Sequence, residues 1–599
     1  MRRWMLGPLM LAISGLSAAA PALAQTTPTS VPRAAIAVNQ LGYTPHGHKR
    51  ALLLNSPQPS LPVLVLDAHS QIELARLTPG VVRKAGHGIA VQQVEFSALN
   101  TSGEYLLVQG ALRSSRFRIE ASPYAALMKS ALRSYYLQRC NTAIHDPVSG
   151  LRHPVCHPLD GRIARDDGIN RQGQAWSANG GWHDAGDYGK YIATAAVTVS
   201  RLLSLYEAAP DRFDVLRLDI PESANAVPDL LDEARFELEW MLNMQRQDGA
   251  VYRKLSGAQW PKEVMPHQDD QVRLVYGVSS PDTGKFAATL AQAARVYAGF
   301  DPVFSARCLQ AATRAWTWLQ GSKGVGGAKD IPAVKDQTID YHPADDGGSG
   351  SYLASGIDRE PSLATDRDDR LAAASELYLI TAGPEYLGYL QRNIPRADYT
   401  LFEWKDMSSL GLWHLLQRSS GEPLKAARAH IRKKLLARAE RALRTVDGNA
   451  YGLADTQFVW GSNKLIAEEG INLVYAYWLT EDTKYLRAAT HQLDYLLGVN
   501  PFAMAYVTGF GQRSVQHPNH IPMRNSDARL AGLMVGGPSV HGEDGITPKN
   551  LGALSYIDHA QAYASNEYAI DYNAALIGLI EALSRQPQPA ADGQPSKEP

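Results

Sequence analysis

From residue 122 onward, apolar residues recur at helical spacing in one segment after another, with loops and no strands between them. Twelve segments show the pattern: 122–138, 189–208, 226–244, 282–299, 302–320, 367–381, 384–391, 405–418, 424–444, 461–478, 482–497 and 567–584. Apolar positions repeating at intervals of three and four residues indicate amphipathic helices. Twelve consecutive helices fit six helical hairpins closed into an (α/α)6 barrel, which we expect over residues 121–584.

Residues 34–120 have a different texture. Short runs rich in Val, Ile, Leu and aromatic residues, such as "RALLLN", "PVLVLDA" and "GEYLLVQG", are separated by turn residues. This spacing is typical of a β-sandwich of about 90 residues. A chain of 599 residues is too long for one ordinary core, so a sandwich followed by a helical domain is the expected organisation.

The two ends of the chain are predicted to lie outside these domains. Residues 1–24 combine two arginines, an apolar run and a small-residue Ala-Leu-Ala site, which indicates a secretory signal peptide. Residues 25–33 are expected to be a flexible leader, and the Pro- and Gln-rich residues 585–599 a disordered tail. The protein is therefore expected to be secreted, to the periplasm or the extracellular space.

Charge and hydropathy exclude two classes of partner. The chain carries 59 Lys and Arg against 60 Asp and Glu, a net charge of −1, and shows no basic stripe. This is not the electrostatic footprint of a nucleic-acid-binding protein. After the signal peptide no apolar run approaches the roughly 18 residues that a membrane helix needs. We expect no nucleic-acid partner, no membrane span, and a monomer.

The stretch "GGWHDAGDYGKY" (180–191) crowds two carboxylates, Asp184 and Asp187, into one glycine-rich bend. A simple alternative is that Asp187 caps the helix that follows, because Asp is a favoured capping residue. Two carboxylates on one loop repel each other, however. A fold tolerates this repulsion where both groups must bind one small ligand, such as a water molecule. Holding a water molecule and removing its proton is the task of the base in an inverting glycosidase.

Such an enzyme also needs a general acid, and Glu567 in "YIDHAQAYASNEYAIDYNAAL" (556–576) is a candidate. The pattern places Glu567 in the first turn of an apolar helix. A glutamate there could simply complement the helix dipole, which lowers the pKa of the carboxyl group and is unfavourable for an acid. Burial against neighbouring tyrosines, Tyr563 among them, would raise that pKa again. The sequence leaves open which effect dominates.

These motifs carry a specific resemblance. "GGWHDAGDYGKY" resembles the catalytic-base motif of glycoside hydrolase family nine, the inverting cellulases with an (α/α)6 barrel. Residues 556–574 match the acid motif of that family at each fixed position, and "FVWGSN" (458–463) and "YLLGVNP" (495–501) are also similar to family stretches. "IAVNQLGY" (36–43) resembles the start of the immunoglobulin-like domain that precedes the barrel in one subgroup. The similarity spans roughly residues 35–584.

The resemblance implies a reaction and a role for each carboxylate. Asp187 would be the general base, Asp184 would help to position the water, and Glu567 would be the general acid. The implied activity is hydrolysis of a β-1,4-glucan or a cello-oligosaccharide with inversion, most simply by an endo-β-1,4-glucanase. Two alternatives remain open: an exo-acting or oligosaccharide-trimming enzyme on a related or substituted glucan, and a non-catalytic polysaccharide-binding protein. No organic cofactor is expected.

A Cys2His2 set surrounds the base motif. Cys140, Cys156, His157 and His183 are the residue types of a tetrahedral zinc site, although their spacing is not that of a standard zinc finger. A disulfide between Cys140 and Cys156 is an alternative in an exported protein. The resemblance implies a structural zinc at these positions, where it would anchor the loop that carries the two aspartates.

A calcium site is also predicted from the resemblance. The segment "ATDRDDRLAAASELY" (364–378) is similar to the calcium loop of the family, with Asp368 and Asp369 as oxygen donors and Asp406 as a third. Hard cations prefer several such oxygens. The alternative is a charged helix start with ordinary capping.

The sugar-contacting stretch departs from the family pattern. Where a His and an Arg are usual, "HPNHIPMR" (517–524) has Asn519 and Ile521. His520 and Arg524 are candidates to replace them, and a preference for a substrate other than plain cellulose is the alternative. Unless these two residues take over the lost contacts, we expect weaker use of long soluble glucan than is typical of the family. Trp460 and Tyr563 are further candidates for sugar contact, with a place in the hydrophobic core as the alternative for Trp460.

Overall fold

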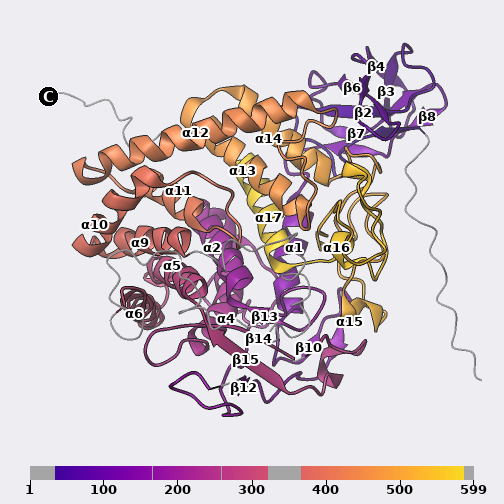
Figure 1. Cartoon of the computed structure of the whole chain (residues 1–599). Coiled ribbons are helices and arrows are strands. Elements are labelled where there is room, and N and C mark those ends of the chain that lie inside the picture. Colours follow the sequence, from indigo (N-terminus) through magenta and orange to yellow (C-terminus); the bar gives the residue numbers. More distant parts are fainter. Residues whose placement is uncertain (1–33, 165, 258, 322–365, 586–599) are drawn as a thin grey trace, which may run out of the picture.

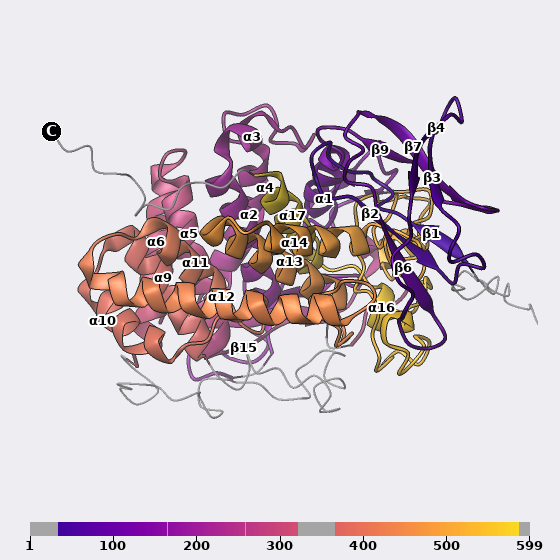
Figure 2. The same cartoon turned by 90° about the horizontal axis from the view of Figure 1, so that it is seen from above.

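The computed structural model describes residues 34–164, 166–257, 259–321 and 366–585. The predicted signal peptide and leader, and the predicted tail beyond residue 585, lie outside these residues. Figures 1 and 2 show a β-rich domain at one end of a larger helical domain, beside α14 and α16. Within the described residues, no helix has both the length and the apolar composition needed to cross a membrane.

The N-terminal domain is a sandwich of two antiparallel sheets. One sheet has the order β1-β2-β6-β5 and the other β4-β3-β7-β8, with β9 also paired to β7. The strands are β1 (Ala35–Ala37), β2 (Arg50–Leu54), β3 (Val63–Asp67), β4 (Glu73–Leu77), β5 (Arg83–Lys84), β6 (Ala90–Glu95), β7 (Gly103–Gln109), β8 (Leu112–Arg113) and β9 (Phe117–Ile119). Alternate side chains such as Leu53, Val65 and Leu107 fill the space between the sheets.

Strand β2 explains how the sandwich docks on the helical domain. Ala51 and Leu53 face the sandwich core, whereas Leu52 and Leu54 join the core of the larger domain. A strand covered on both faces reads as a continuous apolar run, which is the pattern of "RALLL". The side chain of Asn39 also donates a hydrogen bond of 3.0 Å to Asp494 across the interface.

The larger domain is an (α/α)6 barrel, as the helical periodicity predicts. Its inner helices are α2 (Ile192–Ala208), α5 (Ser280–Tyr297), α9 (Arg367–Thr381), α11 (Ser408–Arg418), α13 (Ser462–Thr480) and α17 (Ile570–Ser584). Its outer helices are α1 (Ala125–Leu137), α4 (Asp229–Asn243), α6 (Pro302–Leu319), α10 (Pro384–Asn393), α12 (Lys425–Gly448) and α14 (Thr483–Leu496). Each predicted helix is present, with ends displaced by four residues or fewer.

Burial separates the two rings of helices. Inner helix α17 is buried on all sides from Ile570 through Ala582, and most of its residues are apolar. Outer helix α12 buries one stripe that includes Ile431, Leu435 and Ala439, a spacing of four residues, and leaves its charged face to solvent. This difference follows from the amphipathic pattern of a helix that covers a core and the uniform pattern of one inside it.

The expectation that no strands occur among the helices is wrong. A four-stranded sheet has the order β12-β15-β14-β13, with β12 (Arg162–Ile163), β13 (Lys190–Tyr191), β14 (Tyr252–Gly257) and β15 (Arg273–Val278). A hairpin pairs β10 (Ile144–His145) with β11 (Arg152–His153). Strands β12 and β13 are two residues long and pair with partners distant in sequence. Strands β14 and β15 are buried along nearly their whole length, so burial does not alternate along them. Strand β13 directly precedes α2 and fixes the end of the loop that carries Asp184 and Asp187.

Candidate active site

The loop before α2 is held at both ends. The backbone N–H of His183 donates to the carbonyl of Gln138 at 2.8 Å, and β13 pairs with β14 at the other end. The N–H of Asp184 donates to the carbonyl of Gly189 at 2.9 Å and closes the bend. Helix α2 begins at Ile192 and no side chain caps it. The structure therefore excludes the alternative in which Asp187 is a helix cap.

Asp187 is buried, and Asp184 is half-buried. Thr194 donates a hydrogen bond to Asp184, and the N–H of Gly189 donates to Asp187 at 3.1 Å. Burial raises the pKa of Asp184 well above its usual value, and the charges of Asp571 and Asp187 add to the shift. Burial also raises the pKa of Asp187, against the opposing hydrogen bond from Gly189 and the positive charge of Arg273.

Glu567 lies in an extended link between α16 (Tyr563–Asn566) and α17, with φ −82° and ψ 140°. The prediction that it occupies the first turn of a helix is wrong, because α17 starts only at Ile570. Burial raises the pKa of Glu567 well above its usual value, and the charges of Asp187 and Asp184 raise it further. Burial therefore prevails over any helix-dipole effect, and Glu567 is favoured in its protonated form.

Gly186 joins the two carboxylate-bearing segments. Its N–H donates to Oε1 of Glu567 at 3.3 Å, and its carbonyl accepts from the N–H of Ile521 at 2.8 Å. A Cβ atom at this position would lie 2.5 Å from the carbonyl oxygen of Asn519. The N–H of Asn519 in turn donates to the carbonyl of Asn566 at 2.8 Å. Only glycine permits this close approach, which places Glu567 against the Asp184–Asp187 bend.

The structure corrects the predicted role of His520. This side chain is fully buried, and its Nε2 lies 3.0 Å from Oε1 of Gln138. Its Nδ1 accepts from the N–H of Met523 at the start of the short helix α15 (Ile521–Arg524). Burial lowers the pKa of His520 to about 3, so the ring is neutral. His520 supports the fold beneath the site and presents no group to a sugar.

Arg524 lies near Glu567 and is already paired. Its Nη2 and Nε donate to the carboxylate of Glu263 at 2.7 and 2.9 Å, and its Nη1 donates to the carbonyl of Ala560 at 2.9 Å. The positive charge of Arg524 lowers the pKa of Glu567, opposing the effect of burial. Contact between Arg524 and a sugar stays a prediction.

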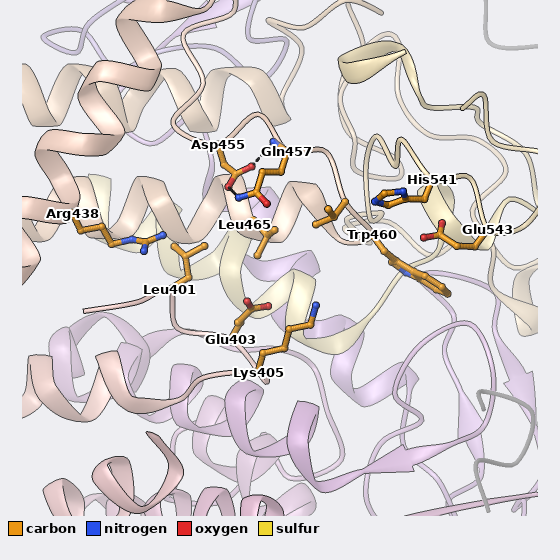
Figure 3. A pocket seen from close by; sticks show the side chains of 11 residues that line it. Leu401, Glu403, Lys405, Arg438, Asp455, Gln457, Trp460, Leu465, His541 and Glu543 are labelled. Carbon is orange, nitrogen blue, oxygen red and sulfur yellow. Dashed lines mark hydrogen bonds between the residues drawn. The ribbon is translucent and has the colours of Figure 1, made fainter. Parts of the chain in front are cut away.

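A pocket of about 300 Å³ opens beside Trp460 (Figure 3). The indole of Trp460 packs against the ring of Tyr563, with centroids 5.4 Å apart, and Tyr563 is four residues before Glu567. The remaining wall combines Leu401, Val459 and Leu465 with polar residues that include Glu403, Lys405, Asp455, His541 and Glu543. An aromatic surface beside polar groups is the usual composition of a ligand pocket, and the core alternative for Trp460 is not what the structure shows.

The four predicted zinc ligands converge in a buried group. Cys140, Cys156, His157 and His183 offer ligand atoms that all lie within 4.8 Å of one another. The Sγ atoms of the two cysteines are 3.9 Å apart, and both are free thiols. Sγ of Cys140 is 3.5 Å from Nδ1 of His157, and Sγ of Cys156 is 4.0 Å from Nε2 of His183.

These spacings fit a zinc ion. Zinc–sulfur bonds of about 2.3 Å and zinc–nitrogen bonds of about 2.0 Å give tetrahedral edges of roughly 3.5–3.8 Å. The ring of His157 points its other nitrogen, Nε2, at Asp269 at 3.4 Å, and an outer carboxylate of this kind fixes the orientation of a metal-binding imidazole. The group can therefore hold a metal ion. One of its members, His183, directly precedes Asp184 in the sequence.

The predicted calcium ligands are arranged differently. Nζ of Lys285 on α5 lies 2.7 Å from Oδ1 of Asp369, and both side chains are buried. The positive charge of Lys285 also acts on Asp368 and Asp406, where it opposes the pKa increase caused by burial. Asp406 accepts hydrogen bonds from the N–H and hydroxyl of Ser408 at 2.9 and 2.7 Å. The described residues give the calcium prediction no support, because an ammonium group already neutralises one of the three carboxylates.

Comparison with known proteins identifies the family of both domains. The model of glycosyl hydrolase family 9 matches residues 124–580, and that of the cellulase N-terminal Ig-like domain matches residues 32–114. A xyloglucan-specific endo-beta-1,4-glucanase of Bacteroides ovatus is 33% identical, over 94% of this chain and 96% of its own length.

Solved structures similar to this chain are family 9 enzymes as well. The crystal structure of a metagenome-derived family 9 endoglucanase is 38% identical, with a TM-score of 0.82 over 92% of this chain and 99% of its own. A zinc-binding triple mutant of the family 9 endoglucanase J30 is 31% identical, with a TM-score of 0.80 over 90% of this chain and 99% of its own. The chain belongs to glycosyl hydrolase family 9, with an N-terminal immunoglobulin-like domain before its (α/α)6 barrel.

Proposed function

We propose that this protein hydrolyses β-1,4-glucosidic bonds with inversion, as an endo-β-1,4-glucanase. One observation carries the proposal: the N–H of Gly186 reaches Glu567 at 3.3 Å from the same bend that carries Asp184 and Asp187. Three carboxylates from two distant segments, two of them buried and Asp184 half-buried, thus meet at one site. An inverting glycosidase needs such a set, with an acid on one side of the scissile bond and a base with its water on the other.

The environment of each carboxylate suits a different role. Glu567, whose pKa is raised by burial and by two neighbouring negative charges, keeps its proton for the leaving oxygen. Burial raises the pKa of Asp187 too, but the N–H of Gly189 and the positive charges of Arg273 and Lys254 oppose this shift and favour the ionised form. Separated pKa values of two nearby carboxyl groups assign the acid and the base. Asp187 then removes a proton from the water that Asp184 helps to hold.

The pocket beside Trp460 supports a sugar substrate. The Trp460 and Tyr563 rings offer an apolar face, and the carboxylates and lysine on the wall offer hydrogen-bonding groups for hydroxyls. This polar wall favours a second candidate, a substituted or shorter glucan. A relative that is 33% identical is named for xyloglucan. Soluble β-1,4-glucan, xyloglucan and cello-oligosaccharides are therefore the substrates to compare.

Zinc is proposed as a structural ion held by Cys140, Cys156, His157 and His183. When bound, it would supply a cross-link between the segment after α1 and the loop that carries the proposed base, and no chemical step is assigned to it. His183 adjoins Asp184, so the ligand set holds this aspartate in place. Export of the protein through its first 24 residues, and action as a monomer, are proposed on the sequence alone.

Two substitutions test the proposed reaction. Asp187→Ala and Glu567→Gln should each lower kcat on soluble β-1,4-glucan by at least about 100-fold, because general acid–base steps contribute roughly 10²–10⁴. Binding of a cello-oligosaccharide, followed by calorimetry, should persist in both variants. Near-normal turnover in either variant removes that residue from the mechanism. Saccharide binding without hydrolysis by the wild-type protein would instead support a non-catalytic binding protein.

A further inference from the structure

Lys464 lies in the first turn of α13 and is enclosed by two carboxylates and two aromatic rings. Its Nζ is 3.1 Å from Oε2 of Glu403 and 3.1 Å from Oδ2 of Asp571, and its side chain is 5% exposed. The ammonium group also lies 5.5 Å from the ring centroid of Trp404 and 5.9 Å from that of Tyr572. A lysine held on all sides in this way has little freedom to move.

The two carboxylates belong to different parts of the site. Glu403 lines the pocket beside Trp460 (Figure 3). Asp571 is buried at the start of α17, four residues after Glu567, and the N–H of its neighbour Ile570 donates to the carbonyl of Asp184 at 2.9 Å. Lys464 therefore connects the pocket wall, on one side, to the segment that carries Glu567 and contacts the Asp184 backbone, on the other.

The ion pair between Lys464 and Asp571 also neutralises negative charge next to Asp184. Asp571 is buried, and its negative charge acts directly on the half-buried Asp184. A buried carboxylate that loses its cation is left with an uncompensated charge. Without Lys464, Asp571 would be repelled by Asp184 and by Glu403, and the start of α17 would shift away from the bend.

We propose that Lys464 is a positioning residue that clamps the start of α17 to the pocket wall and thereby sets the spacing between Glu567 and the Asp184–Asp187 bend. The inference rests on the proposed function. A shift of about 1 Å in a reacting group can cost about 100-fold in rate. The clamp therefore affects turnover more than affinity, because Lys464 itself touches no proposed reacting atom.

Three variants separate positioning from folding. Lys464→Met keeps the length of the side chain and removes its charge, and Lys464→Arg restores the charge. Arg201→Met is the matched control, because Arg201 on α2 forms a buried ion pair of 2.7 Å with Glu468, one turn further along α13, and has no contact with Asp571. The readouts are kcat and KM on soluble β-1,4-glucan, per molecule shown to be folded by circular dichroism.

We expect Lys464→Met to lower kcat by about 10–100-fold while KM changes by less than about threefold. Lys464→Arg should recover most of kcat, and Arg201→Met should lose stability but keep kcat. Wild-type kcat in folded Lys464→Met, or equal losses in Lys464→Met and Arg201→Met, would overturn the inference. If Lys464→Met does not fold, the double variant Lys464→Met with Asp571→Asn, which removes one charge of each sign, takes its place. Wild-type kcat in this double variant would also overturn the inference. A wild-type protein that cleaves no glucan refutes the proposed function instead.

Discussion

Cys156→Ser should remove the metal from the buried Cys2His2 group and leave the fold otherwise intact. The Sγ atom of Cys156 is 3.9 Å from Sγ of Cys140 and 4.0 Å from Nε2 of His183, so it is one corner of the ligand tetrahedron. A hydrogen bond with Cys140 lowers the pKa of the Cys156 thiol to about 7, against the opposing effect of burial. The thiol of Cys156 ionises near neutral pH, and the resulting thiolate is the form that binds zinc. A serine hydroxyl does not ionise at this pH, so it cannot replace the thiolate.

The size of the effect follows from linkage. Zinc present at about 1,000 times its dissociation constant stabilises the folded state by about 4 kcal/mol. Residues 124–580 match the catalytic domain, and a domain of that size has an unfolding entropy of about 1 kcal/mol per kelvin. Loss of the ion should therefore lower Tm by about 4 °C. Because His183 precedes Asp184, kcat should fall as well.

The assay combines metal analysis with thermal unfolding. Wild-type protein should contain about one zinc per chain and lose it to a strong chelator, with Tm falling to the value of the Cys156→Ser variant. Cys308→Ser is the matched control, since Cys308 is a buried free thiol on α6, outside the ligand group; it should keep its zinc. Metal-free wild-type protein with a Cys140–Cys156 disulfide and full activity would refute this reasoning.

Two further predictions concern the groups around Glu567. Arg524→Met removes a positive charge that lowers the pKa of Glu567, so this pKa should rise and the acid should stay protonated to higher pH. The alkaline limb of the kcat/KM profile should therefore move to higher pH. A limb that stays in place or moves to lower pH would show that Glu567 is not the titrating acid. Trp460→Ala removes the aromatic face beside Tyr563. If a sugar stacks on this face as strongly as another aromatic ring would, about 1 kcal/mol is lost, so KM for soluble glucan should rise by about fivefold with little change in kcat, and unchanged KM would exclude this pocket as a sugar site.

Sequence periodicity predicts much of the fold because it reports local burial. The stripe of Ile431, Leu435 and Ala439 on α12 is visible in the sequence alone. The sheet built from β12 to β15 is not, because Arg162 pairs with Leu274 across more than a hundred residues. Pairing of this kind depends on the closed barrel and leaves no local pattern.

The site, too, is predicted only in part from the sequence. The motif alone draws attention to Asp184, Asp187 and Glu567, but apolar periodicity extends α17 back over Glu567, where the chain is in fact extended. The sequence predicts sugar contact for His520, because a polar residue in a loop gives no sign that Gln138 lies beside it in the core. Lys464 was missed because its partners, Glu403 and Asp571, come from separate elements.

The central claim is that Asp187 and Glu567 act on opposite sides of a β-glucosidic bond. Proton NMR during the first minutes of cello-oligosaccharide hydrolysis, before the sugar mutarotates, tests it most directly. A water molecule activated by Asp187 attacks from the face opposite the leaving group, so the account predicts that the new reducing end appears as the α-anomer. Initial release of the β-anomer would contradict the account, since it would require a carboxylate that attacks the sugar itself.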